Sequence, residues 1–114
     1  MRSIEKKALQ REILPGFWKV HILHHAAEGP VVGQWMIREL RRHGYEIGPG
    51  TIYPLLTRLK QHGWFECESD PNRGLKDRRE YLLTKKGRSA LSIVKKQLEE
   101  LYSEVVLGQD EEKL

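Results

Sequence analysis

The chain has 114 residues and a formal net charge of +4, which is the size of one small domain and too short for an elaborate catalytic cleft. Its single cysteine, Cys67, excludes an intramolecular disulfide, and no apolar run approaches the ~18 residues of a membrane-spanning helix. The charged N-terminus has no apolar stretch of the signal-peptide kind, so we expect a cytoplasmic protein.

Charge is distributed unevenly along the chain. Residues 73–88 carry seven basic and two acidic side chains, whereas residues 99–114 carry six acidic and one basic. In the first 72 residues of the chain, basic and acidic side chains are nearly equal in number. A positive segment beside a negative tail predicts an anionic partner for the segment and a solvated, frayed end for the tail.

Two helical segments are predicted before residue 30. Residues 4–12 form a short one, and Pro15 and Gly16 separate it from the next. The second segment continues to the stop at residues 29–30. Apolar residues at 3-3-4 spacing predict its inward face, which consists of Phe17, Val20, Leu23 and Ala27.

A pair of helices with a short connection follows. The first, within residues 31–44, is expected to end at Gly44, and the second, over residues 49–62, to end at Gly63. Their expected buried positions are Val32, Met36, Ile37 and Leu40 in the first helix, and Ile52, Leu55, Leu56 and Leu59 in the second. Two helices joined in this way are typical of a helix-turn-helix.

The second helix of this pair begins with an unusual sequence, Gly-Pro-Gly-Thr-Ile-Tyr-Pro. Pro49 suits the first helical position, where a missing N–H has no consequence. Pro54 is expected close enough to the start that few intrahelical hydrogen bonds are lost. We therefore predict an N-terminal turn that is kept small so that its backbone can approach another molecule.

Two strands and a long helix complete the chain. Residues 64–69 alternate between apolar and acidic side chains, and residues 78–84 contain an apolar run, so both are predicted strands. The loop between them is basic, and two strands joined by a basic loop after a helix-turn-helix predict a wing. Thr84 is the expected N-cap of a helix reaching about residue 107. Its apolar residues follow a heptad spacing that predicts a dimer seam, made of Leu91, Val94, Leu98, Leu101 and Val105, with Tyr102 beside it. The alternative is that the first turn or two, around Leu91, packs on the chain's own domain.

The expected fold class is therefore mainly α with a small β-hairpin (α+β), a winged helix-turn-helix with a C-terminal dimerisation helix. Residues 1–83 would form the winged-helix domain, residues 84–107 the dimerisation helix, and residues 108–114 the acidic tail.

The motifs "GTIYPLLTRL" with Gly63, and "YLLT" with Gly87, resemble those of the PadR family of bacterial winged-helix transcriptional regulators. The single C-terminal helix is similar to the short subgroup of that family. The resemblance spans about residues 12–105 and implies a dimeric, DNA-binding transcriptional regulator, most simply a repressor, with release by a small-molecule effector suggested by the resemblance alone. No cofactor is implied.

Two groups of residues are candidates for DNA contact. The recognition helix offers Thr51, Tyr53, Pro54, Thr57, Arg58 and Lys60, with Gln61 beside them. The wing and the start of the last helix offer Arg73, Lys76, Arg78, Arg79 and Lys85, with Asn72, Lys86 and Arg88 nearby. Helix N-termini and basic side chains both favour phosphate. The alternative is that Tyr53 belongs to the core and that the basic residues only solvate the surface.

Aromatic and histidine residues raise two further hypotheses. In the family, effectors lie between the first and last helices of the dimer, so Trp18, Trp35 and Tyr102 are candidates for an effector pocket; the alternative is that the tryptophans, Trp64 included, are core or interface anchors. His21 and His25 are four residues apart on one helical face and are weak metal candidates. No carboxylate or second cysteine at a matching spacing supports them, so we expect no metal site.

Three classes of function remain to be compared. The leading one is a homodimeric regulator that binds double-stranded DNA. A winged-helix module that binds protein instead of DNA is the alternative, because a fold does not determine a function. An enzyme is the weakest reading, since no nucleophile–base pair, phosphate-binding glycine loop or metal set stands out in the sequence.

Overall fold

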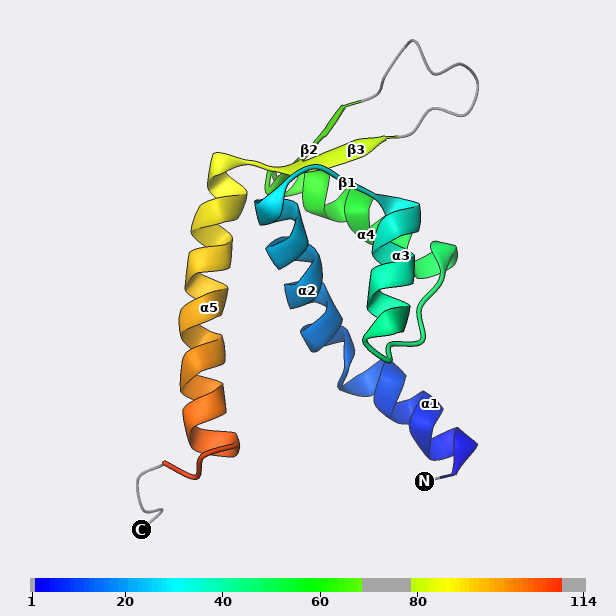
Figure 1. Cartoon of the computed structure of the whole chain (residues 1–114), viewed down its shortest axis with the longest axis vertical. Coiled ribbons are helices and arrows are strands. Elements are labelled where there is room, and N and C mark those ends of the chain that lie inside the picture. The colour runs from blue at the N-terminus through cyan, green and yellow to red at the C-terminus, as the bar shows by residue number, and fades with distance from the viewer. Residues whose placement is uncertain (1, 69–78, 110–114) are drawn as a thin grey trace.

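The computed structural model describes residues 2–68 and 79–109, which form a helical body with a three-stranded sheet at one end (Figure 1). In chain order the elements are α1 (Ser3–Glu12), α2 (Pro15–Glu28), β1 (Val31–Val32), α3 (Gly33–Arg42), α4 (Pro49–Gln61), β2 (Phe65–Glu68), β3 (Glu80–Leu83) and α5 (Lys85–Val105). No helix among these combines the length and the apolar character needed to cross a bilayer.

The helix-turn-helix is formed by α3 and α4, as the sequence predicts. Met36, Ile37 and Leu40 of α3 are buried, and Gly44 follows with a φ of 93°, a left-handed conformation that favours glycine. In α4 the buried residues are Ile52, Leu55 and Leu56, with Leu59 partly buried against them. These side chains meet those of α2, β3 and α5 in one hydrophobic core.

The sheet has three strands, so the prediction of a simple hairpin was incomplete. Strand order is β1-β3-β2, and both pairings are antiparallel. Val31 and Val32, which we assigned to the start of a helix, instead pair with Tyr81 and Glu80 of β3. Two β-branched residues directly after Pro30 suit an extended backbone, and Val31 is buried there.

The inward face of α2 also differs from the prediction. Trp18, Ile22 and Ala26 are buried, whereas Phe17 is 43% exposed. Apolar residues occupy two neighbouring stripes of this helix, and adjacent stripes are only ~100° apart. Periodicity therefore could not choose between them, and packing against the sheet and α5 decides.

Pro54 lies deeper in α4 than we expected. It is the sixth residue of the helix, and an N–H at this position would bond to the carbonyl of Gly50. The proline thus removes one interior hydrogen bond and sits within the helix despite that loss.

Thr84 connects the end of α4, the sheet and α5. Its backbone N–H donates to the carbonyl of Trp64 at 2.9 Å, and its hydroxyl donates to the carbonyl of Gly63 at 2.6 Å. The same hydroxyl oxygen accepts from the N–H of Gly87 at 3.0 Å, which makes Thr84 the N-cap of α5 as predicted. A Cβ on Gly87 would lie 2.2 Å from the carbonyl oxygen of Trp64.

We predict that Gly87→Ala lowers the free energy of unfolding by about 2–3 kcal/mol, because the new methyl group has only backbone and Leu83 to displace. Chemical unfolding followed by circular dichroism measures the loss. Ser92→Ala, on the exposed face of the same helix, is the control and should change stability by less than about 0.5 kcal/mol. If both variants were as stable as the wild type, the close contact between Gly87 and the carbonyl oxygen of Trp64 would be contradicted.

Candidate nucleic-acid interface

The outer face of α4 runs opposite its buried stripe. At 100° per residue, this face carries Gly50, Pro54, Thr57 and Gln61, and all four are exposed. The hydroxyl of Thr57 donates to the carbonyl of Tyr53 at 3.1 Å, so it presents its methyl group and oxygen lone pair outward instead of a free proton. The face is narrow and bears no charged group along its centre.

Gly50 has no structural partner that would explain the absence of a side chain. A Cβ built on it meets nothing within 4 Å, and its φ does not lie in the left-handed region. Glycine inside a helix costs about 0.5–1 kcal/mol relative to alanine. The fold therefore tolerates this residue without requiring it, and its place on the outer face of α4 leaves the helix backbone open to another molecule there.

One flank of α4 faces a groove that α1 and α2 help to form. Thr51 and Arg58 line this groove of about 510 Å³ together with the buried ring of Trp18. Three further basic residues border it: Lys7, Arg11 and Lys19. Sequence reasoning missed these three, because their helices precede the helix-turn-helix and only the fold brings them beside Arg58.

Tyr53, on the other flank of α4, is partly packed against the protein and partly exposed to solvent. Its ring packs against Gly33 at the start of α3, where a Cβ would lie 2.5 Å from Cε1 of the tyrosine, yet 38% of the residue is exposed. Lys60 is exposed on the same flank. The ring is thus anchored on α3, and its exposed edge borders the outer face of α4.

The wing and the start of α5 are only partly described. Asn72, Arg73, Lys76 and Arg78 lie outside the described residues. Arg79 is exposed just before β3. Lys85 is exposed at the first turn of α5, next to the C-terminal end of α4, which places it about 20 Å along that helix from its N-terminal turn.

The two other basic residues of this region make contacts within the protein. The side chain of Lys86 lies over Gly63, with Cδ 3.5 Å from the position of a Cβ there. Nη2 of Arg88 donates to the carbonyl of Ala27 at 3.4 Å. Lys85 is therefore the residue of this group that is most available to an outside anion.

The apolar seam of α5 divides into a buried and an exposed part. Leu91 is 5% exposed and belongs to the protein's own core, so its assignment to the dimer seam is wrong and the alternative, packing on the chain's own domain, holds for this residue. Val94 is half-buried. Beyond it the apolar residues are exposed: Leu98 43%, Leu101 45%, Tyr102 52% and Val105 68%.

The three candidates for an effector pocket do not converge within one chain. Trp18 lines the groove beside α4, whereas Trp35 of α3 lines a separate hollow with Val31 and Val32. Tyr102 is exposed on α5. A pocket that joins α2 to the last helix of a second subunit stays a prediction.

A cluster of three histidines lies between α2 and the C-terminal end of α3. His43, its C-cap, stacks on His21 of α2 with ring centroids 4.6 Å apart, and His25 lies one turn further along α2. Burial and the neighbouring imidazoles lower the pKa of His21. A hydrogen bond from Arg42 lowers the pKa of Glu39 to about 2, so this carboxylate beside the cluster is ionised.

Comparison with known proteins identifies the family. Residues 22–93, more than half of the chain, match the sequence model of the transcriptional regulator PadR-like family. The chain belongs to this family. It is a transcriptional regulator, and the resemblance inferred from the motifs of α4 and β3 is confirmed.

Individual relatives agree with this assignment. The chain is 46% identical over 99 residues to "Transcriptional regulator Rv3488" of Mycobacterium tuberculosis, an alignment that covers 87% of this chain and 92% of that protein. A PadR-like transcriptional regulator from Bacillus cereus superposes with a TM-score of 0.74 at 27% identity, covering 88% and 99% of the two chains. A PadR family regulator from Eggerthella lenta gives 0.71 at 30% identity, covering 90% and 84%. The winged-helix fold is thereby confirmed.

Tyr53 permits a test of structural against surface roles. We predict that Tyr53→Ala lowers the free energy of unfolding by about 1–2 kcal/mol, because the contact of the ring with Gly33 is lost. Unfolding by urea, followed by circular dichroism, measures this loss. Tyr53→Phe, the matched control, keeps the contact with Gly33 and should unfold at the same urea concentration as the wild type. Equal stability of the alanine variant would show that the ring does not anchor α4 on α3.

Proposed function

We propose that the protein is a homodimeric, sequence-specific DNA-binding regulator, with the outer face of α4 in the major groove. The observation that supports this most strongly is Gly50, an exposed helical glycine that no contact in the described fold requires. In a major groove ~12 Å wide, a helix can approach closely only where its facing side chains are small.

Chemical roles follow from the positions on this face. Gln61 can offer both a donor and an acceptor to an adenine edge, and the methyl group of Thr57 and the ring of Pro54 suit the thymine methyl group. The N-terminal turn of α4, with Thr51, attracts phosphate through its dipole. The base contacts of Gln61, Thr57 and Pro54 would specify the DNA sequence, and the phosphate contact at the N-terminal turn would position the helix.

Basic residues around α4 would hold the DNA backbone. Arg58, Lys7, Arg11 and Lys19 gather at the groove on one flank, and Lys60 lies on the other. Arg79 and Lys85 would extend the contact, and Arg73, Lys76 and Arg78 of the wing remain part of the proposal on sequence alone. Phosphate contacts of this kind position a protein and carry no sequence information directly.

The exposed seam of α5 would form the dimer. Leu98, Leu101 and Val105 are three apolar residues on one face of a helix whose second half has no packing partner among the described residues. Figure 1 shows α5 extending alongside α2 and away from the sheet. Two such faces can cover each other about a twofold axis, which would place the two α4 helices on half-sites about 34 Å apart.

Repression follows as the simplest mode of action, because a dimer on a promoter excludes other proteins. Release by a small-molecule effector stays part of the proposal on resemblance alone, with Trp18, Trp35 and Tyr102 as the candidates for its pocket. A protein-binding module is the competing function, and the exposed apolar face of α5 is the feature that favours it. The two predictions below separate these functions.

Gly50→Ala should strengthen the fold and weaken DNA binding. The added methyl group raises the free energy of unfolding by up to about 1 kcal/mol, because alanine loses less backbone conformational entropy than glycine when the chain folds. The same methyl group should lower the affinity for DNA at least about tenfold, or ~1.4 kcal/mol, because it holds α4 away from the floor of the major groove. Fluorescence anisotropy with duplex DNA from upstream of the protein's own gene, against a scrambled duplex at several salt concentrations, measures this.

Gly16→Ala is the matched control for this variant. Gly16 is also the second residue of a helix that begins with proline, and its Cβ position is also open. It belongs to α2 and does not line the groove beside α4. It should gain stability and keep wild-type DNA affinity. Wild-type affinity of Gly50→Ala, or equal binding of wild type to both duplexes, would contradict the proposed use of α4.

Replacing both Leu98 and Leu101 by glutamate should convert the dimer into a monomer. Four carboxylates would then face one another across an apolar seam, which is unfavourable without partners. Light scattering should give twice the 13.4 kDa chain mass for the wild type and the single mass for the variant.

Ser89→Glu with Ser92→Glu adds the same charge on exposed positions of the same helix away from the seam, and this control should stay dimeric. A wild-type protein with the mass of one chain at micromolar concentration would overturn the dimer. The exposed face of α5 would then be assigned to another protein.

A further inference from the structure

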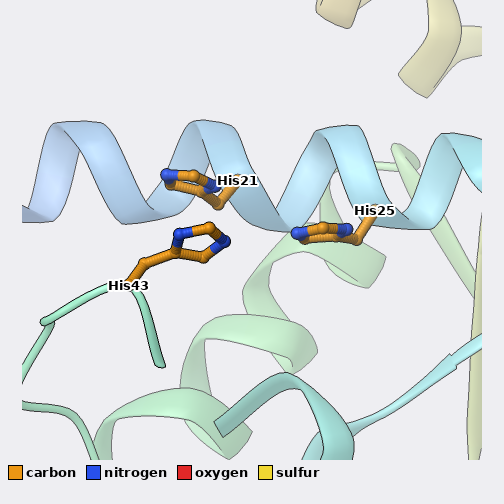
Figure 2. A group of neighbouring side chains, drawn as sticks. All are labelled: His21, His25 and His43. Carbon is orange, nitrogen blue, oxygen red and sulfur yellow. The ribbon is translucent and has the colours of Figure 1, made fainter. Parts of the chain in front are cut away.

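We propose that His21, His25 and His43 form a binding site for a divalent transition metal ion of the Zn²⁺ type. Each of the three rings offers one nitrogen atom as a ligand, and these three atoms lie within 4.8 Å of one another. Figure 2 shows the three side chains facing a common space between α2 and the end of α3. This site is separate from the outer face of α4, and the inference does not depend on DNA binding.

The third imidazole is what the sequence could not reveal. His21 and His25 are one helical turn apart, which alone is a weak signal. The fold adds His43 from a position 18 residues later in the chain, because α3 returns along α2. Our expectation of no matching ligand therefore does not hold. Imidazole nitrogen is a preferred ligand of Zn²⁺, Ni²⁺, Cu²⁺ and Co²⁺.

His25 is already oriented as a ligand. Its Nδ1 lies 3.1 Å from Oε1 of Glu28, and donation of the Nδ1 proton to this carboxylate leaves a lone pair on Nε2. Nε2 is buried and has no hydrogen-bond partner among the described residues. A buried acceptor without a partner is costly, and a metal ion would satisfy it.

Glu39 supplies a second supporting carboxylate. Its Oε1 is 3.1 Å from Nε2 of His43 and 3.8 Å from Nε2 of His25, while Nε of Arg42 donates to its other oxygen at 3.2 Å. Carboxylates that accept from ligand imidazoles fix the ring orientation, and losing one typically weakens metal binding 10–100-fold. Glu39 thus acts through His43 as a positioning residue.

Metal binding requires the rings to rotate. The rings of His21 and His25 are within 17° of parallel, and those of His21 and His43 within 26°. A tetrahedral Zn²⁺ with bonds of about 2.0–2.1 Å needs ligand nitrogens about 3.4 Å apart, so each side chain must turn by a modest amount. His43 is a helix cap with an exposed side, which leaves it room to do so.

A competing group includes His24, His25 and Glu28. All three belong to the last turns of α2, and His24 and Glu28 are exposed, so this set offers only two imidazoles and no second element of the fold. The cluster with His43 joins two helices and would add a cross-link between them. Binding there should raise the unfolding temperature, since the ion binds the folded chain and not the separated ligands.

The experiment uses the full chain without a polyhistidine tag, stripped with EDTA. Zn²⁺ titration by calorimetry should give one site per chain, Co²⁺ should produce visible d–d bands, and Zn²⁺ should raise the unfolding temperature. His43→Ala should weaken Zn²⁺ binding at least 100-fold and abolish the thermal shift. Glu39→Gln should weaken binding about tenfold.

Two controls keep the result specific. His24→Ala tests the competing group, and His62→Ala removes a histidine that stacks on Trp64, away from the cluster. Both should bind Zn²⁺ like the wild type. If His43→Ala does not fold in EDTA, His43→Asn takes its place, because it keeps a polar cap without an imidazole.

Several outcomes would overturn the site. These are a wild-type chain without a stoichiometric site, wild-type affinity in both the His21→Ala and the folded His43 variants, or a loss of binding in His24→Ala alone. None of these measurements uses DNA, so the metal site and the proposed function can fail separately.

Discussion

The junction at Thr84 and Gly87 is the contact on which the rest of the structure depends. Through one hydroxyl and one backbone N–H, Thr84 ties the exit of α4 to the start of α5. Gly87 lets the two elements approach to backbone contact. The direction of α5, and with it the position of the exposed seam relative to the outer face of α4, follows from this approach.

Within α4, stability and surface shape are in conflict. Gly50 lowers helix stability, and Pro54 removes an interior hydrogen bond. The buried stripe of Ile52, Leu55 and Leu56 compensates through packing in the core. A helix held by one face can therefore keep its other face small, which is the physical condition for close approach to a groove.

Local patterns predicted most of the helices and the wing strands. Gly44 and Gly63 mark the ends of α3 and α4, and both have positive φ as such stops require. The same reasoning failed for α2 and for β1. Two adjacent apolar stripes on α2 are equivalent in sequence, and two valines form a strand only because β3 lies beside them.

The sequence by itself determined the family, the order of the main elements and the outer face of α4, because these depend on periodicity, capping and local turn chemistry. Only the tertiary structure decided which residues from distant segments meet. It brought Lys7, Arg11 and Lys19 beside Arg58, decided that Leu91 packs in the core and not on the seam, and placed His43 against His21 and His25. Such contacts arise from packing between helices, and no spacing along the chain encodes them.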